Sequence, residues 1–231
     1  MTRPDPAPAA LDLGHAGLKA RQRAIRAGFP DAFGLRIHRT LSWLGRAERE
    51  GADDAARFLF LWIAFNAAYA DETDVLGTRP QGERGAFAGF FRQLVRLDRE
   101  GRLADCVWAR FPGPVRLLLS NRYLYGPFWS HRNGVAGFED WEAQLGAARR
   151  AAHHALERQD TAVVLRILFD RLYVLRNQVM HGAATWNGGV NRDQLRDGAA
   201  LLGCLVPVMA GVMMDHPAED WGRPFYPVVD G

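Results

Sequence analysis

The sequence of 231 residues is poor in cysteine, with only Cys106 and Cys204, and neither belongs to a CxxC pair. This spacing gives no disulfide framework and no cysteine zinc site. The N-terminus lacks the continuous apolar core of a signal peptide, and its run of proline and alanine indicates a disordered leader. The simplest interpretation is a chain in a reducing, cytoplasmic setting.

The sequence also lacks a large excess of charge of one sign. Its 29 basic and 26 acidic residues leave a formal net charge of +3. Bulk charge therefore does not by itself indicate a nucleic-acid or membrane partner. Lys19 is the only lysine, and we attribute the resulting excess of arginine first to codon bias. An isolated arginine is weak evidence for phosphate binding in such a chain.

No uninterrupted hydrophobic run reaches the length of a membrane span. The two most apolar stretches are residues 55–70, which Arg57 and Asn66 interrupt, and residues 199–214, which Pro207 interrupts. Both fall short of the roughly 20 residues that cross a bilayer. We predict that both are buried core helices and that the protein has no membrane partner.

The residues that are present are those of a folded globular chain, with 48% hydrophobic, 24% charged and 11% aromatic residues. Helical periodicity dominates, so we predict an all-α fold. We divide the chain into a partly disordered leader (residues 1–30), one helical domain (31–215) and an extended tail (216–231). No internal repeat is visible.

Turn and capping residues mark the expected helices. A first helix runs from Asp31 to about Glu50 and ends at Gly51, and Asp53 or Asp54 caps a second helix that pairs with it as an antiparallel hairpin. Residues 71–85 read as a loop. Further helices are expected at about 87–99, 141–158, 161–181 and 191–215, with an irregular insertion of short helical pieces at 102–137.

The helix at 161–181 carries two adjoining apolar stripes when it is drawn at about 100° per residue. One stripe holds Val164, Leu168, Leu175 and Val179, and the other holds Leu165, Phe169, Tyr173 and Met180. A helix that is apolar on two sides lies at the centre of a bundle or of a dimer interface. If the second stripe packs across a two-fold axis, the protein is a dimer.

Three polar residues, Arg176, Asn177 and His181, border this apolar surface close to a stop at Gly182. Asn177 and His181 are neighbours one turn apart, whereas Arg176 lies about 140° from His181 and must reach round the helix. From the residues alone, two interpretations stay open. The three side chains share a ligand, or they only cap the helix end and satisfy backbone groups.

The pattern Arg176-Asn177-x-x-x-His181, followed by Gly182 at the end of an apolar helix, resembles the motif of the HEPN superfamily. The segments RTLSWLGRAE, RFLFLWIAFNAAY and LRNQVMHGAATWN are similar to bacterial HEPN proteins of the Apea-like type. The resemblance covers residues 31–215 loosely and residues 174–202 closely.

This resemblance implies a helical bundle that dimerises across the motif helix and, in active members, cleaves RNA without a metal or other cofactor. A ribose 2′-hydroxyl attacks the adjacent phosphate and leaves a 2′,3′-cyclic phosphate. His181 would then act as general acid or base, because histidine exchanges protons near neutral pH. Arg176 would hold the phosphate and stabilise its developing charge, and Asn177 would orient one of these two groups.

The same resemblance gives Asn66, on the second of the expected helices, a role in supporting the motif from behind. The alternative role is that of a buried amide whose hydrogen bonds are satisfied and which fixes helix packing. The neighbouring aromatic residues Trp62, Phe65 and Tyr69 recur at helical spacing, which predicts core packing and not a platform for stacking bases.

One departure from the family concerns its toxin branch, which carries a tyrosine two residues after the motif histidine. Here that position is Ala183, so regulation by nucleotidylation of the tyrosine does not carry over. The resemblance still implies a role in stress response or phage defence. It also implies that an antitoxin or another regulatory partner controls the protein. The alternative function is a non-catalytic HEPN module that binds a nucleotide or a partner protein.

Other candidate sites are weaker. His153 and His154 are adjacent on a helix and point to different faces, which does not favour a metal site. His131 and Arg132 would touch a phosphate only if the insertion folds over the motif. The sequence contains no Walker loop, dinucleotide fingerprint, HExxH or GxSxG motif.

Overall fold

The computed structural model describes residues 12–70, 82–183, 185–224 and 226, and within these residues it contains helices and turns but no strand. This confirms the predicted all-α class. The helices are α1 (His15–Ile25), α2 (Asp31–Ala47), α3 (Asp54–Tyr69), α5 (Gly82–Leu97), α6 (Arg102–Asp105), α7 (Pro112–Ser120), α8 (Gly126–Arg132), α9 (Trp141–Glu157), α10 (Thr161–Met180) and α11 (Arg192–Asp215). A π-helical segment (Cys106–Arg110) and two 3-10 turns (Arg26–Gly28 and Arg122–Leu124) complete the described elements.

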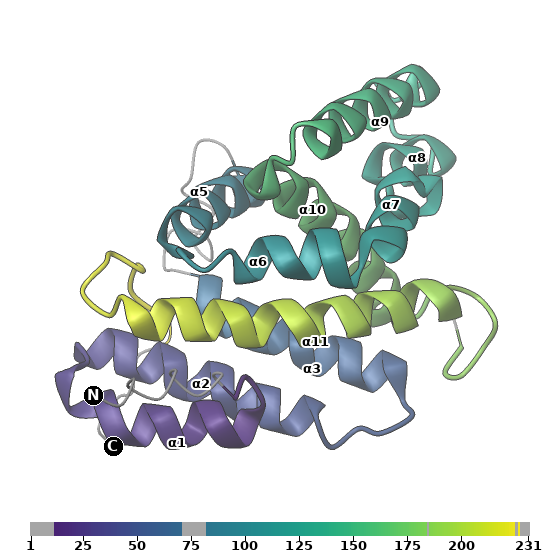
Figure 1. Ribbon diagram of the computed structural model, residues 1–231. Helices are drawn as coiled ribbons and strands as arrows, with labels where there is room; N and C mark the ends of the chain where they lie inside the picture. The colour runs from purple at the N-terminus through teal and green to yellow at the C-terminus, as the bar shows by residue number, and fades with distance from the viewer. Residues whose placement is uncertain (1–11, 71–81, 184, 225, 227–231) are drawn as a thin grey trace.

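Helix α11 runs through the middle of the molecule (Figure 1). Helices α1, α2 and α3 pack on one side of it, and α5, α6, α7 and α10 pack on the other. It is the one helix in the described part of the chain that is long and apolar enough to cross a membrane, and 83% of its most apolar window is buried inside the protein. That burial is typical of a core helix, as predicted for residues 199–214.

The predicted hairpin of α2 and α3 is present, and the two helices pack along each other. The Asp53 side chain caps α3 by accepting a hydrogen bond of 2.9 Å from the Ala56 N–H. The three aromatic residues that were predicted to be core, Trp62, Phe65 and Tyr69, are all buried. Capping and periodicity are both local signals, which is why this part of the fold can be predicted from the sequence.

The leader assignment of residues 1–30 was wrong for α1, because residues 15–25 form a helix that packs on the bundle. Leu18 and Gln22 are buried, and Arg21 forms an ion pair with Asp215 at the end of α11. Of the basic residues in this segment, Arg23 and Arg26 are exposed, whereas Arg21 faces α11. Residues 1–11 lie outside the described residues, as do residues 71–81 of the predicted loop. Helix α5 starts at Gly82, earlier than predicted.

Most of the second apolar stripe of α10 is buried inside the chain and is therefore not available for packing across a two-fold axis. Leu165 and Phe169 are fully buried inside the chain, and the Tyr173 ring lies 6.2 Å from the Trp62 ring of α3. Met180 alone in this stripe is exposed, at 56%. Apart from the end of α10, other helices of the same chain cover most of both stripes, so α10 is central to the bundle.

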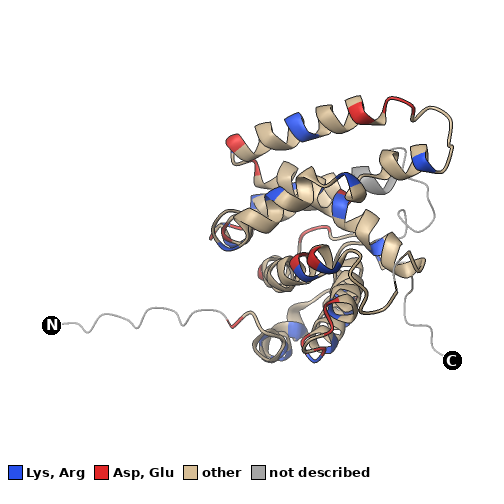
Figure 2. Ribbon diagram, turned by 90° about the vertical axis from the view of Figure 1, so that its right-hand side faces the viewer, with Lys and Arg blue, Asp and Glu red and all other residues tan. Residues whose placement is uncertain are grey.

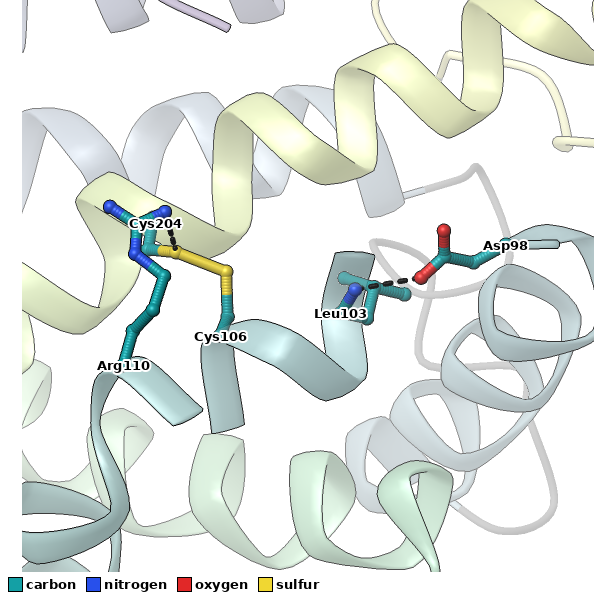
Figure 3. Close-up of a disulfide and its surroundings, with 5 residues drawn as sticks. All are labelled: Asp98, Leu103, Cys106, Arg110 and Cys204. Carbon is teal, nitrogen blue, oxygen red and sulfur yellow. Dashed lines mark hydrogen bonds between the residues drawn. A yellow bond between two sulfur atoms is a disulfide. The ribbon is translucent and has the colours of Figure 1, made fainter. Parts of the chain in front are cut away.

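The two cysteines are joined in a disulfide, which corrects the expectation that they stay unpaired. The bond links the π-helical segment to α11 across a sequence separation of 98 residues, and the Arg110 guanidinium donates to Cys204 Sγ at 3.0 Å. Figure 3 shows this link beside the cap of α6, where the Leu103 N–H donates to Asp98 at 2.7 Å. The cysteines therefore give no argument for a reducing compartment.

The tail after α11 is not helical in its described residues, as predicted, but it is held on the bundle. Trp221 is 8% exposed and its indole N–H donates to the His216 carbonyl at 2.9 Å. The fully buried Arg36 donates to the carbonyls of Ala68, at 2.9 Å, and Gly222, at 3.3 Å. Arg36 thereby ties the end of α3 to the tail.

Candidate functional site

The predicted motif lies at the C-terminal end of α10, which the Asp160 side chain caps at the other end by accepting a hydrogen bond of 3.1 Å from Val163. Gly182 adopts a φ of +69°. Its N–H donates to the Val179 carbonyl at 3.2 Å, and the Ala183 N–H donates to Gln178 at 2.8 Å. These two bonds form a Schellman motif, so the predicted helix stop at Gly182 is confirmed.

Arg176 and Asn177 are in direct contact on the last turns of α10. The Arg176 guanidinium donates a hydrogen bond of 2.8 Å to the Asn177 side-chain oxygen, and both residues are half-buried. Asn177 lies about 100° round the helix from Arg176, toward the histidine. The Arg176 side chain therefore points round the helix in the direction of His181, as predicted. The hydrogen bond to Asn177 fixes the direction of the guanidinium.

His181 is the exposed C-cap residue of α10. Its N–H donates to the Asn177 carbonyl at 3.0 Å, which holds its backbone one turn beyond the asparagine. Within the described residues, no side-chain hydrogen bond joins His181 to Arg176 or Asn177. His181 is thus exposed to solvent one turn beyond Asn177, the residue that accepts from the Arg176 guanidinium.

Gln178 is a functional neighbour that the sequence reasoning missed. Its amide N–H donates to the Tyr123 carbonyl at 2.6 Å, and its oxygen accepts from Asn191 at 2.6 Å. The Trp129 indole also donates to the Tyr123 carbonyl, at 2.7 Å. Gln178 therefore connects both the middle insertion and the start of α11 to the end of the motif helix. A polar residue inside the motif was the available signal.

The loop after the motif is anchored on α3. The Trp186 indole donates to the Asp53 carboxylate at 3.0 Å. Hydrogen bonds from the Ala56 N–H and from Trp186 hold the pKa of Asp53 below its ordinary value, against the opposing effect of burial. The carboxylate that caps α3 thus also fixes the chain that leaves the motif.

Large exposed apolar side chains belong to the segments that meet at this end of α10. We call them the apolar collar: Tyr123, Trp129, Met180, Trp186 and Val190. Met180 is 56%, Trp186 78% and Val190 63% exposed. Exposed apolar side chains form a protein-binding surface where they are contiguous.

Two cavities lie elsewhere, and no motif residue lines either of them. The larger cavity, of about 510 Å³, lies between α7 and α9. The smaller, of about 110 Å³, is lined in part by Tyr125, Arg166, Asp170 and Val174. Arg166 and Asp170 lie on the same face of α10 as Asn177, because whole turns separate them.

The contacts of α3 place Asn66 away from the motif. Trp62 contacts both Phe169, at 6.1 Å, and Tyr173, at 6.2 Å. Phe65, further along α3, contacts Phe169 at 4.4 Å. Helix α3 therefore moves toward the start of α10 as it passes Asn66, which is half-buried. This arrangement does not support the proposed role for Asn66 behind the motif.

The remaining candidates stay apart from the motif. His131 and Arg132 are exposed at the end of α8, and His153 pairs with Glu157 on α9 at 3.2 Å. No cluster of three or more potential metal-ligating side chains occurs among the described residues. Acidic and basic residues both occur along the helices in the view of Figure 2, in agreement with the small net charge.

Comparisons with protein-family models, with curated proteins and with solved structures give no match to this chain.

Proposed function

We propose that the chain is a metal-independent endoribonuclease of the HEPN type, which cleaves RNA as a homodimer. The observation that carries the proposal is the end of α10, where Asn177 holds Arg176 at 2.8 Å and His181 stands exposed one turn away. This reaction needs a phosphate-binding guanidinium and a proton-transferring imidazole, and the last turns of α10 carry one of each.

The proposed reaction is an internal transfer at phosphorus. An imidazole removes the proton of the 2′-hydroxyl, the O2′–P bond forms and the P–O5′ bond breaks. An imidazolium then protonates the leaving O5′. The products are a 2′,3′-cyclic phosphate and a 5′-hydroxyl. Arg176 binds the nonbridging phosphate oxygens, whose charge grows in the transition state.

Two proton transfers require two proton-handling groups, and each chain brings one motif histidine. The second proton-handling group is His181 of the partner subunit. The two motifs must therefore face each other in the dimer. The apolar collar beside the motif supports this arrangement, because a second copy would cover Met180, Trp186 and Val190. The dimer contact would then be the end of α10, since other helices of the chain cover the body of this helix.

The biological setting belongs to the same proposal. RNA as substrate favours a cytoplasmic location, and the family resemblance favours stress response or phage defence under the control of a regulatory partner. A non-catalytic HEPN module is the second candidate function. It is favoured by the two cavities, neither of which is lined by a motif residue.

The test compares wild type with His181→Ala on a generic RNA in the presence of EDTA. We expect His181→Ala to reduce the cleavage rate by roughly 10² to 10⁴-fold without loss of helicity. The matched control is His154→Ala, which removes an exposed histidine from α9 and should cleave like wild type. Equal activity of wild type and His181→Ala would refute the assignment, and inactivity of all three proteins would favour the non-catalytic module.

A further inference from the structure

The groove between α7 and α9 is a built cavity that the proposed function does not use. Its volume is about 510 Å³, which is in the range of sites that hold small molecules. Its floor is formed by Leu119, Ala152 and Leu156, and Arg116, Arg149 and His153 stand at its rim. Apolar floor and basic rim come from the same two helices.

The groove exists because α9 packs on the rest of the chain from one side only. Helix α9 is the outermost helix in both views (Figures 1 and 2), and α7, α8 and α10 are its main contacts. Its buried positions include the small residues Ala152 and Ala155. Alanines at these positions leave space beside α7 that larger side chains would fill.

The floor is apolar and sheltered. Leu119 is 2% and Ala152 is 3% exposed, and Leu156 is half-buried against the core. A hydrocarbon group placed here would leave water for a surface of aliphatic side chains. The hydrophobic effect favours that transfer.

The rim carries excess positive charge. The Arg149 guanidinium is held in place because it donates twice to the Ser120 carbonyl, at 3.1 and 2.6 Å. Arg116 lies one turn before Ser120 on α7 and is exposed, and within the described residues no ion pair engages it. The carboxylate in the lining, Glu157, is paired with His153 at 3.2 Å. An acidic group at the rim would meet Arg116 and Arg149 together.

We propose that this groove binds an amphipathic anion, which is an aliphatic body with one carboxylate or phosphate headgroup. The body lies on Leu119, Ala152 and Leu156, and the headgroup binds Arg116 and Arg149. The lining contains no phenylalanine, tyrosine or tryptophan side chain, so it lacks the large aromatic surfaces on which nucleic-acid bases stack most strongly. The site is separate from the motif and does not depend on ribonuclease activity.

The test is isothermal titration calorimetry of the full chain with decanoate and with decyl phosphate, each below its micelle concentration. We expect one molecule to bind per chain, and the ratio of the two affinities identifies the preferred headgroup. Arg116→Gln should weaken binding by about threefold to tenfold, as expected for the loss of one charged hydrogen bond at an exposed rim. The matched control is Arg150→Gln, an exposed arginine of α9 outside the lining, which should bind like wild type.

A second variant tests the floor. Ala152→Met places a flexible side chain in the groove and should weaken both anions while the circular dichroism spectrum stays unchanged. The proposal is overturned if neither anion binds to wild type, or if Arg116→Gln binds as tightly as wild type. Tighter binding of a nucleoside monophosphate, with displacement of decyl phosphate, would overturn the aliphatic class of ligand.

Discussion

At the scale of single residues, the site depends on how Asn177 holds Arg176. We predict that Asn177→Ala lowers the RNA cleavage rate about tenfold, because the guanidinium keeps its charge but loses its direction. Arg176→Ala removes the charge as well. It should lower the rate by about 10² to 10³-fold, which is the usual effect of removing one group that stabilises charge in the transition state. Single-turnover cleavage rates measure both effects.

The control for this pair is Arg196→Ala, which removes an exposed arginine from α11 and should leave the rate unchanged. If Asn177→Ala cleaves at the wild-type rate, the hydrogen bond does not position the arginine.

Asp53 gives a prediction about pH. Its pKa in the folded protein lies below the ordinary value, so the charged carboxylate stabilises the fold. This contribution is complete above about pH 5 and is lost as the pH falls through the folded-state pKa. Asp53→Asn keeps a capping side chain but cannot ionise.

The unfolding free energies of wild type and Asp53→Asn should therefore differ most near neutral pH and converge between about pH 4 and pH 2. Urea denaturation at a series of pH values measures the difference. A constant difference over this range would show that the Asp53 charge does not contribute.

At the scale of helices, the end of α10 depends on one backbone conformation. Gly182 has a φ of +69°, and an L side chain in this left-handed region costs about 1 to 2 kcal/mol. We predict that Gly182→Ala lowers the unfolding free energy by this amount and loosens the turn that presents His181. Chemical denaturation measures the loss.

Gly189 in the same loop is the control, because it does not have a positive φ and no atom lies within 4 Å of an added Cβ. Gly189→Ala should be nearly neutral. An equal loss in both variants would mean that the loop as a whole, and not the helix stop, responds to substitution.

Helix ends could be predicted from the sequence because the signals are local. Asp53 and Gly182 each act within a few residues of their own position, and the structure confirms both. Tertiary partners could not be predicted in the same way. The two stripes of α10 fit a bundle centre and a dimer interface equally well, and only the packing of Phe169 against α3 and α5 decides between them.

Helix α1 and the site neighbours show the same limit. Its apolar side contributes one large core residue, Leu18, which is too little periodicity for a firm prediction. The contact of Gln178 with Tyr123 joins residues that are 55 positions apart, and no spacing rule connects them. The motif itself could be found because all of its residues lie on one helix end.

At the scale of the whole molecule, the disulfide closes a loop over a sequence separation of 98 residues. Loop-closure entropy predicts that reduction lowers the unfolding free energy by about 2 to 5 kcal/mol. Denaturation with and without dithiothreitol measures this. Cys106→Ser should show the same loss and no response to the reductant. A wild-type protein that is insensitive to reductant would mean that the bond does not form in solution.

The apolar collar makes a prediction about assembly. Light scattering at micromolar concentration should give a dimer for wild type, whereas Met180→Glu should give a folded monomer, because it places a charge in the contact. The control is Val135→Glu, which changes an exposed apolar residue between α8 and α9 and should stay dimeric. An active wild-type monomer would contradict the two-histidine site.

The reaction that we propose for the end of α10 is attack of an RNA 2′-hydroxyl on the adjacent phosphate. The most direct measurement is the chemical identity of the RNA ends that wild type produces with EDTA present, determined by mass spectrometry. We expect wild type to produce 2′,3′-cyclic phosphate and 5′-hydroxyl ends, and we expect these ends to be absent when His181→Ala is used. Products with 3′-hydroxyl and 5′-phosphate ends, or cyclic phosphate ends that persist in His181→Ala, would contradict it.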